Sequence, residues 1–148
     1  KVFIGGALAN DCFKALGYEV GKSQVSTESV DLKSVVEDSK TIVPIDVVVK
    51  RGDSSVTTPS TSVEKGDVIV DVGPQSISNL GEVLASAKFV LWNGPLGNYE
   101  IGYDQATMNL AKLIAGFDGN ITSMIGGGDT VAYVQHLLAS LHSRAFGG

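Results

Sequence analysis

The sequence predicts an α/β domain of three layers, in which helices cover both faces of a mainly parallel central sheet. Short apolar runs alternate with stretches of helical period along the 148 residues. Several of these runs end in glycines, which is typical of tight turns from a strand into a helix. Hydrophobic residues make up 43% of the chain and charged residues only 18%, which is enough apolar material for one buried core.

The first half of the chain opens with a strand–turn–helix unit, in which residues 2–4 form the strand and residues 7–16 the helix. A second helix is expected over residues 27–40, behind a Ser or Thr cap. Residues 45–49 are apolar on both faces, which favours a covered, parallel strand. The Ser-, Thr- and Pro-rich residues 52–62 predict a solvated loop or an excursion at a sheet edge.

The second half repeats the same alternation. Strands are expected at residues 68–72, 89–92 and 121–125, and a helix follows each of them. All the predicted strands are expected to share one Rossmann-like sheet. The helix faces are marked by Ile77, Leu80, Val83 and Leu84, then by Tyr103, Ala106, Leu110 and Ile114, and last by Val131, Val134, Leu137, Leu138 and Leu141.

Three consecutive glycines, residues 126–128, separate the last strand from the last helix. Asp129 or Thr130 is the expected N-cap of that helix. Such a loop leaves free backbone N–H groups at the positive end of a helix, and glycines let an anion approach them. The loop therefore suits a phosphate, although glycines that only make a tight turn would look the same.

The loop after the strand at residues 89–92 is longer than a simple connection needs. Gly94 and Gly97 allow close backbone approach, Asn93 offers a donor and an acceptor, and Glu100 is an isolated carboxylate. This loop and the glycines after residues 2–4 follow parallel strands, so they could converge where α/β proteins bind ligands. A capping loop with a solvated Glu100 is the alternative.

Composition narrows the possible partners and the location. The formal net charge of -5 argues against a nucleic-acid surface. No apolar run approaches the ~20 residues of a membrane span. Cys12 is the only cysteine, so the chain cannot form an internal disulfide, and a cytoplasmic location is expected. Cys12 itself is expected to be a small, buried hydrophobic residue.

Two other nucleotide motifs fit poorly. Residues 17–23 end in Gly-Lys-Ser, but their glycine spacing is one residue short of a P-loop and they follow a helix. A dinucleotide fingerprint starting at Gly126 would have Val131 where its third glycine belongs, and no acid follows at the required distance.

Three motifs together resemble the C-terminal, nucleotide-binding half of phosphoglycerate kinase: residues 4–10, residues 92–100 and residues 125–130. The resemblance spans nearly all of the chain and implies binding of Mg-ATP or Mg-ADP, with no catalytic residue among these positions. The nucleotide-binding residues that it implies are Gly5, Gly6, Ala7, Asn93, Pro95, Gly97, Glu100, Gly126, Gly127, Gly128, Asp129 and Thr130.

The resemblance also implies a role for each group. Gly5, Gly6 and Ala7 would lie against adenosine, Asn93, Pro95 and Gly97 would line the path from adenosine to the phosphates, and Glu100 would bind the ribose hydroxyls. Gly127 and Gly128 would lie behind the phosphates, and Asp129, with Thr130 beside it, would help to hold Mg²⁺. These roles agree with the chemistry, because carboxylates suit hydroxyls or hard cations and glycine N–H groups suit phosphate oxygens.

The chain departs from the family pattern at three positions. Ile69 stands where the family usually has a Gly beside the adenine, and Asn98 stands where it usually has Val. Phe146 replaces a Thr before the last glycine run, of which only residues 147–148 remain.

The resemblance predicts that residues 1–148 are the C-terminal ATP/ADP-binding domain, truncated at both ends. The catalytic Lys and the basic acid-substrate site of the family lie outside this chain, and the two nucleotide loops contain no Lys or Arg. Phosphoryl transfer needs such cations, so the chain alone is expected to be inactive. Its expected partners are the N-terminal phosphoglycerate-binding domain or, through exposed surfaces, a second copy. A non-catalytic nucleotide-binding or scaffold module on the same fold is the alternative.

Overall fold

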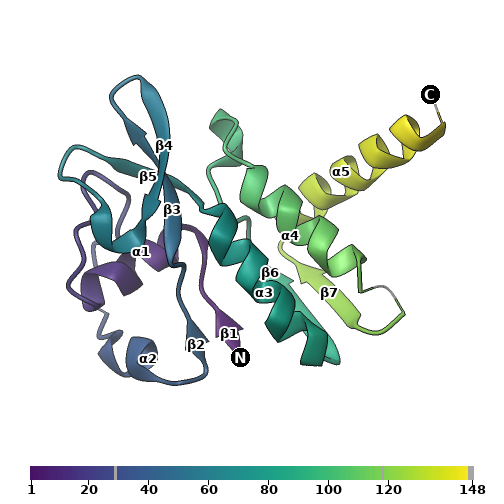
Figure 1. Ribbon diagram of the computed structural model, residues 1–148, viewed down its shortest axis with the longest axis horizontal. Helices are drawn as coiled ribbons and strands as arrows, with labels where there is room; N and C mark the ends of the chain where they lie inside the picture. The colour runs from purple at the N-terminus through teal and green to yellow at the C-terminus, as the bar shows by residue number, and fades with distance from the viewer. Residues whose placement is uncertain (29, 118, 147–148) are drawn as a thin grey trace.

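The computed structural model describes residues 1–28, 30–117 and 119–146, and it is an α/β protein with parallel strand pairs (Figure 1). Its strands are β1 (Val2–Phe3), β2 (Thr41–Ile42), β3 (Asp46–Arg51), β4 (Ser54–Pro59), β5 (Val68–Val72), β6 (Phe89–Asn93) and β7 (Thr122–Gly126). Its helices are α1 (Gly6–Ala15), α2 (Lys33–Glu37), α3 (Pro74–Ser86), α4 (Gln105–Ala115) and α5 (Gly128–Phe146), with short 3-10 turns η1 (Ser60–Ser62) and η2 (Tyr99–Ile101).

The strands form separate sheets. β1 pairs with β2 and β6 pairs with β7, and both pairs are parallel. The prediction that the strands at residues 89–92 and 121–125 lie in the same sheet is therefore confirmed. The third sheet has the order β4-β3-β5 and is antiparallel throughout.

The expectation that residues 45–49 and 68–72 belong to the parallel sheet was wrong. A tight turn at Gly52, whose φ is +59°, folds β4 back onto β3, so most of the expected loop is a strand. Val47 and Val49 are buried against α1, while Val48 on the other face is half-buried. Both faces of β3 are therefore at least partly buried, and this is why its sequence is apolar on both faces, a pattern that is typical of a parallel strand.

The helix expected over residues 27–40 was also wrong in extent, because α2 covers only Lys33–Glu37. Apolar side chains of the expected helix are not buried: Val30 is 60% exposed and Val35 is 37% exposed. Without a buried face, a short helix has little to stabilise it. The helices expected after residues 72 and 102, by contrast, are confirmed as α3 and α4.

The last helix begins earlier than expected. α5 starts at Gly128, so Asp129 and Thr130 lie in its first turn and neither is the N-cap. Its first backbone bond runs from the Val131 N–H to the Gly127 carbonyl, at 3.0 Å. Gly127 has a φ of +84°, which glycine adopts without strain and which turns the chain from β7 into α5. Gly147 and Gly148 lie outside the described residues.

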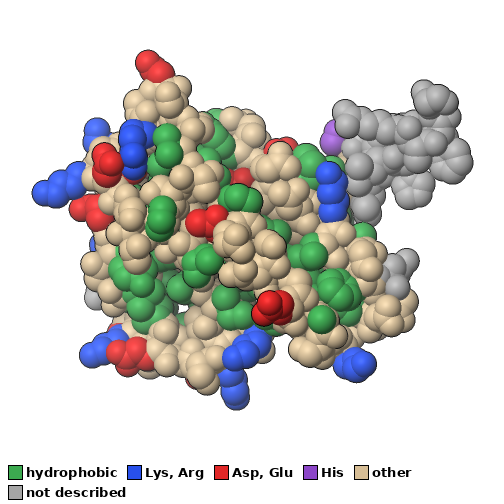
Figure 2. All heavy atoms as spheres, viewed as in Figure 1, with side chains coloured by type: hydrophobic (Ala, Val, Ile, Leu, Met, Phe, Trp, Pro, Cys, Tyr) green, Lys and Arg blue, Asp and Glu red, His purple; other side chains and the backbone are tan. Residues whose placement is uncertain are grey.

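Two buried clusters hold the fold together. One joins α1 to the antiparallel sheet through Phe13, Val47 and Val49. The other joins α3, α4 and α5 to β6 through residues such as Leu80 and Trp92. On the face shown in Figure 2, Lys and Arg lie mainly near the edges and hydrophobic side chains reach the surface between them. None of the helices in the described ranges is long and apolar enough to cross a membrane.

Candidate functional site

The loops that follow β1 and β6 meet, as the sequence predicted for loops that follow parallel strands. Gly6 begins α1 with a φ of +63°, and a Cβ atom there would lie 3.1 Å from the Pro95 carbonyl oxygen. A Cβ atom on Gly5 would lie 2.6 Å from Leu96 Cδ2. Both glycines are therefore needed for the backbone of one loop to approach the other this closely.

Beside this junction lies a cavity of about 690 Å³ between α1, β5 and the loop after β6, which we call the α1–β5 cavity. The sequence-predicted site residues on its wall are Gly6, Ala7, Pro95, Gly97 and Glu100. Two of the three departures from the family pattern, Ile69 and Asn98, also line it. Gly5 and Asn93 do not, since they line a second cavity on the other side of the junction.

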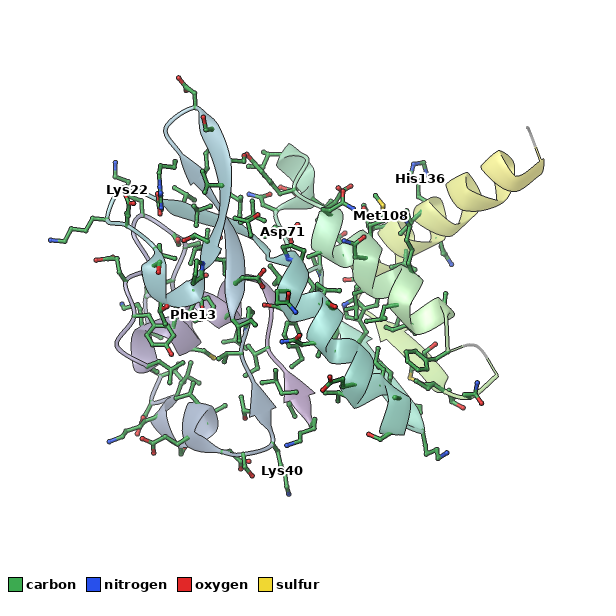
Figure 3. The ribbon with its side chains drawn as sticks, viewed as in Figure 1. Phe13, Lys22, Lys40, Asp71, Met108 and His136 are labelled. Carbon is green, nitrogen blue, oxygen red and sulfur yellow. The ribbon has the colours of Figure 1, made fainter. Side chains whose placement is uncertain are left out.

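Asp71 of β5 fixes the position of the loop after β6. Its Oδ2 accepts a hydrogen bond from the Ala106 N–H at 3.1 Å, and its Oδ1 accepts one from the Val72 N–H at 2.9 Å. A Cβ atom on Gly97 would lie only 2.3 Å from the same Oδ1, so the loop packs directly on this carboxylate. In Figure 3, Asp71 lies in the interior, where β5 meets the helices.

Burial raises the pKa of the Asp71 carboxyl to about 6. The hydrogen bonds from the Ala106 and Val72 N–H groups lower the pKa, while the negative charge of Asp104 raises it further. Desolvation prevails because the side chain is almost fully buried, with 4% of its residue surface exposed. The carboxyl beneath the cavity wall therefore titrates close to neutral pH.

The glycine loop after β7 packs against the turn that follows β6. A Cβ atom on Gly127 would lie 3.0 Å from Asn93 Oδ1, so the Asn93 side chain lies directly over the loop. Trp92 donates its indole N–H to the Gly94 carbonyl at 2.7 Å, which fixes the turn that carries Asn93. Thr130 is buried, whereas Gly128 is exposed at the first position of α5.

An aromatic contact brings the glycine loop close to Glu100. The Tyr99 ring, next to Glu100 in η2, lies 5.8 Å from the Tyr133 ring of α5, measured between centroids. Burial raises the pKa of the Tyr99 hydroxyl, and the charges of Asp129 and Glu100 raise it further. Both carboxylates therefore lie within electrostatic reach of one phenol.

Several residues on the cavity wall were not predicted. Asn10 is 3% exposed, and its Nδ2 donates to the Gln24 carbonyl at 2.8 Å. Its buried Oδ1 has no hydrogen-bond partner among the described residues. Lys22 and Lys50 add two cations to the wall.

One of these residues carried a signal in the sequence. Lys22 belongs to the Gly-Lys-Ser segment that failed as a P-loop, and Gly21 forms an antiparallel bridge with Val68. The segment is thus no P-loop, yet its lysine lines the cavity. Asn10 offered no such signal, because burial and an unpaired oxygen arise only from packing.

The residues described here include no group of three or more His, Cys, Asp or Glu side chains that could hold a metal ion. Asp129 is exposed at the start of α5, beside Gly128. A single carboxylate fits Mg²⁺ when phosphate oxygens and water supply the other ligands.

A family model described as "PGK: Phosphoglycerate kinase" matches residues 1–144. A phosphoglycerate kinase of Levilactobacillus brevis is 35% identical over 144 residues, covering 93% of this chain and 36% of the relative. A second phosphoglycerate kinase, from Zymomonas mobilis subsp. mobilis, is 40% identical over 148 residues, which cover 91% of this chain and 37% of the relative. The structure of phosphoglycerate kinase from Coxiella burnetii superposes with a TM-score of 0.80 at 30% identity, covering 93% of this chain and 38% of that one. The chain thus spans little more than a third of the length of these proteins.

Proposed function

The chain belongs to the phosphoglycerate kinase family, and from that premise we propose that it is the C-terminal, nucleotide-binding half of such an enzyme. The observation that carries this proposal is that one loop, the loop after β6, lines the α1–β5 cavity with Pro95, Gly97 and Glu100 and packs against the glycine loop through the turn at Asn93. A cavity of about 690 Å³ next to a helix N-terminus suits a nucleoside joined to phosphates.

The adenosine part of ATP or ADP would occupy the α1–β5 cavity. Gly6 and Ala7 contribute no large side chain to its wall, and Leu96 offers apolar surface to the base. Glu100 is exposed at the rim, where its carboxylate can accept hydrogen bonds from the ribose hydroxyls.

The phosphates would extend toward Gly127 and Gly128. The free N–H groups and the positive end of the α5 dipole stabilise negative charge there. Asp129, with Thr130 behind it, would hold Mg²⁺ together with phosphate oxygens. When bound, Mg²⁺ neutralises part of the phosphate charge; the protein's own contribution is to position and orient the nucleotide.

The parent enzyme would transfer a phosphoryl group between 1,3-bisphosphoglycerate and ADP, a step of glycolysis in the cytoplasm. The cationic clamp for the moving group would come from elsewhere in the longer protein, because neither nucleotide loop contains a Lys or Arg. The N-terminal phosphoglycerate-binding domain is the partner that this division requires. The chain alone would bind nucleotide and show no measurable turnover.

A non-catalytic nucleotide-binding or scaffold module is the second candidate. Ile69 favours it, because this branched side chain lines the α1–β5 cavity where the family usually has no side chain at all. A filled adenine position would weaken ATP and ADP while leaving the fold intact.

Equilibrium titration with Mg-ATP, Mg-ADP and NADH tests the proposal. We expect both adenine nucleotides to bind and NADH to bind much more weakly. Glu100→Ala should weaken ADP by about tenfold, since a charged hydrogen bond contributes ~1.5 kcal/mol, and should leave inorganic phosphate unaffected. Gly128→Val should weaken both ligands, because its side chain stands between phosphate and the α5 N–H groups.

The matched control is Glu82→Ala, which removes an exposed carboxylate of α3 away from the site. Unchanged ADP affinity in both Glu100→Ala and Gly128→Val would show that the site is misplaced. Absence of any adenine-nucleotide binding by the unmodified chain would favour the scaffold alternative.

A further inference from the structure

Tyr133 is a half-buried residue of α5 that joins this helix to a different part of the fold. Thr130, Val134 and Leu137 are buried on the same side of the helix, so Tyr133 belongs to the face by which α5 packs on the rest of the molecule. The Tyr133 hydroxyl donates a hydrogen bond to Asp104 Oδ2 at 2.7 Å. This bond connects α5 to the position where α4 begins.

The Asp104 carboxylate is available to Tyr133 because another carboxylate caps α4. An Asp at the N-cap position usually accepts hydrogen bonds from N–H groups in the first turn of its own helix. The Asp104 side chain makes no such bond, although its backbone carbonyl accepts one from the Met108 N–H at 2.9 Å. The Ala106 N–H donates instead to Asp71 Oδ2, at 3.1 Å. The Asp104 carboxylate therefore serves α5 rather than its own helix.

The Tyr133 phenol remains a hydrogen-bond donor at neutral pH. Burial raises its pKa above the usual value, and the hydrogen bond to Asp104 and the negative charges of Asp104 and Asp71 raise it further. A hydroxyl that donates to a carboxylate forms a charge-assisted bond, which is stronger than a bond between two neutral groups. The contact with Asp104 is thus a strong and constant link.

The Tyr133 ring makes a second contact, with η2. Its centroid lies 5.8 Å from that of the Tyr99 ring, and the two planes are tilted by 48°, within the range of favourable aromatic pairs. Tyr99 precedes Glu100, which lines the α1–β5 cavity. The Gly102 N–H bonds to the Tyr99 carbonyl at 3.0 Å, so η2 is a closed turn. One side chain of α5 therefore contacts the turn that carries Glu100.

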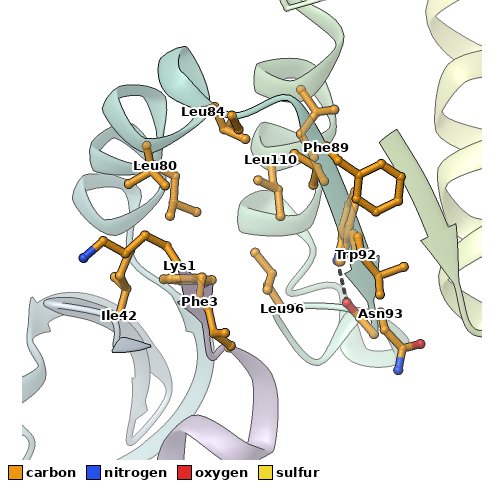
Figure 4. A pocket seen from close by; sticks show the side chains of 18 of the residues that line it. Lys1, Phe3, Ile42, Leu80, Leu84, Phe89, Trp92, Asn93, Leu96 and Leu110 are labelled. Atoms are coloured by element: carbon orange, nitrogen blue, oxygen red, sulfur yellow. Dashed lines mark hydrogen bonds between the residues drawn. The ribbon is translucent and has the colours of Figure 1, made fainter. Parts of the chain in front are cut away.

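The glycine loop before α5 is held separately, from the side of β6. Trp92 donates its indole N–H to the Gly94 carbonyl, the bond drawn in Figure 4. The turn that this bond fixes places Asn93 over Gly127. These contacts position the loop, and Tyr133 extends the support to the helix that follows it.

We propose that Tyr133 is a positioning residue for nucleotide binding. It holds the first turn of α5, where the phosphates would bind, at a fixed distance from Glu100, where the ribose would bind. This inference rests on the proposed function, because it takes the two places as the ends of one nucleotide site. A ligand that spans both ends gains affinity when they are held at the right separation, whereas a ligand that occupies one end gains nothing.

Tyr133→Phe removes the hydroxyl and keeps the ring, and Tyr103→Phe is the matched control. The Tyr103 hydroxyl also bonds to another element, but its partner is Ser55 Oγ of β4, at 2.8 Å, rather than a residue of α5. NMR titration measures the affinities for Mg-ADP, adenosine and inorganic phosphate. We expect Tyr133→Phe to weaken Mg-ADP by about tenfold and to change the other two by less than about twofold. Tyr103→Phe should change none of the three affinities.

The acceptor residue provides an independent pair of variants. Asp104→Asn keeps an oxygen that can accept the Tyr133 hydroxyl, whereas Asp104→Ala removes it. We expect Asp104→Asn to retain Mg-ADP affinity within about threefold and Asp104→Ala to lose about as much as Tyr133→Phe. Combining Asp104→Ala with Tyr133→Phe should weaken Mg-ADP no further, because both substitutions remove the same bond. If Tyr133→Phe fails to fold, as judged by circular dichroism, the Asp104 pair decides the question.

A measurement without ligand tests the positioning of α5 by itself. The Val131 N–H bonds to the Gly127 carbonyl in the first turn of the helix. We expect its amide hydrogen to exchange at least about threefold faster in Tyr133→Phe than in the unmodified chain, and at an unchanged rate in Tyr103→Phe. Equal exchange in all three proteins would show that Tyr133 does not hold this turn, whether or not nucleotide binds.

Three results of the titrations would also overturn the proposal. Equal Mg-ADP affinity of Tyr133→Phe and Tyr103→Phe would remove the role of Tyr133 and leave the proposed function standing. Equal weakening of Mg-ADP, adenosine and inorganic phosphate by Tyr133→Phe would show a general loss of structure instead of lost positioning. Absence of Mg-ADP binding by the unmodified chain would overturn the proposed function, and this inference with it.

Discussion

Gly97, in the loop after β6, packs closely against the rest of the molecule. A Cβ atom there would lie 2.3 Å from Asp71 Oδ1 and 2.4 Å from the Tyr103 carbonyl oxygen. We expect Gly97→Ala to lower the free energy of unfolding by ~1–3 kcal/mol, because the loop must move to relieve the overlap. Urea denaturation measures this loss, and nucleotide affinity should fall with it.

Gly66→Ala is the matched control for that substitution. Gly66 also lacks a positive φ, and a Cβ atom there would have no neighbour within 4 Å. Its replacement should change the free energy of unfolding by less than ~0.5 kcal/mol. If the two variants unfold at the same urea concentration, the close packing of Gly97 on Asp71 is not what holds the loop.

Asp71 should make stability depend on pH. Its pKa in the folded protein is about 6, above the ordinary 3.8, so the folded state binds more protons than the unfolded state between these values. The free energy of unfolding should therefore fall as pH rises from about 4 to about 6. Asp71→Asn mimics the protonated carboxyl and should flatten this part of the profile.

Urea denaturation at several pH values measures the effect, with Asp53→Asn on the exposed β3–β4 turn as the control. Titration of Asp67 cannot produce the same pH dependence of stability. The hydrogen bond from Arg51 lowers the pKa of Asp67 to about 2, so its contribution is lost only as pH falls below 3.8. A profile that keeps its slope in Asp71→Asn would assign the titration to another group.

At the scale of residues, the sequence predicted those site residues whose type alone indicates a binding role. Gly97 and Glu100 were predicted from the length and glycines of one loop, and both line the α1–β5 cavity. Asp71 and Asn10 were missed. A raised carboxyl pKa and an unpaired buried oxygen depend on neighbours that only the folded chain brings together.

At the scale of elements, Asp46 joins the antiparallel sheet to the helical half of the fold. Its carboxylate in β3 accepts hydrogen bonds from the N–H groups of Gln75 at 3.0 Å and Ser76 at 2.8 Å, in the first turn of α3. We expect Asp46→Ala to cost ~1–2 kcal/mol, the usual range for a lost N-cap. Thermal or urea unfolding checks it, with Asp53→Ala as the control; equal stability of the two variants would contradict the capping role.

Element positions were predicted better than strand directions. The existence of α3, α4 and α5 followed from periodicity, because each has an apolar face in the buried cluster, and β6 followed from its continuous apolar run. Hydrophobic periodicity carries no information about strand direction, so it could not predict that β3 pairs with β5 in an antiparallel way. The helix expected at residues 27–40 was wrong in extent for a related reason. A hydrophobic pattern does not show whether another part of the fold is available to cover an apolar side chain such as Val30.

At the scale of the whole molecule, the α1–β5 cavity and the second cavity, which lies between β1 and β6, are on two sides of one loop junction. In place of the predicted single sheet there are two parallel pairs, β1–β2 and β6–β7, beside the antiparallel sheet, and the second cavity lies between the two pairs. The sequence pattern could identify the strands of both pairs. It could not show that their facing edges are unpaired, because pairing is a property of the assembled sheet.

Paramagnetic NMR with Mn²⁺ in place of Mg²⁺ tests the central claim, that this chain holds a metal–nucleotide complex across the cavity and the glycine loop. With ADP present, we expect the strongest line broadening at the amides of Gly128 and Asp129, and chemical-shift changes from the base at Ala7 and Gly97. Mn²⁺ alone should broaden Asp129 only weakly, since one carboxylate binds a hard cation poorly. Broadening centred elsewhere, or ADP-induced shifts confined to the cavity between β1 and β6, would contradict the account.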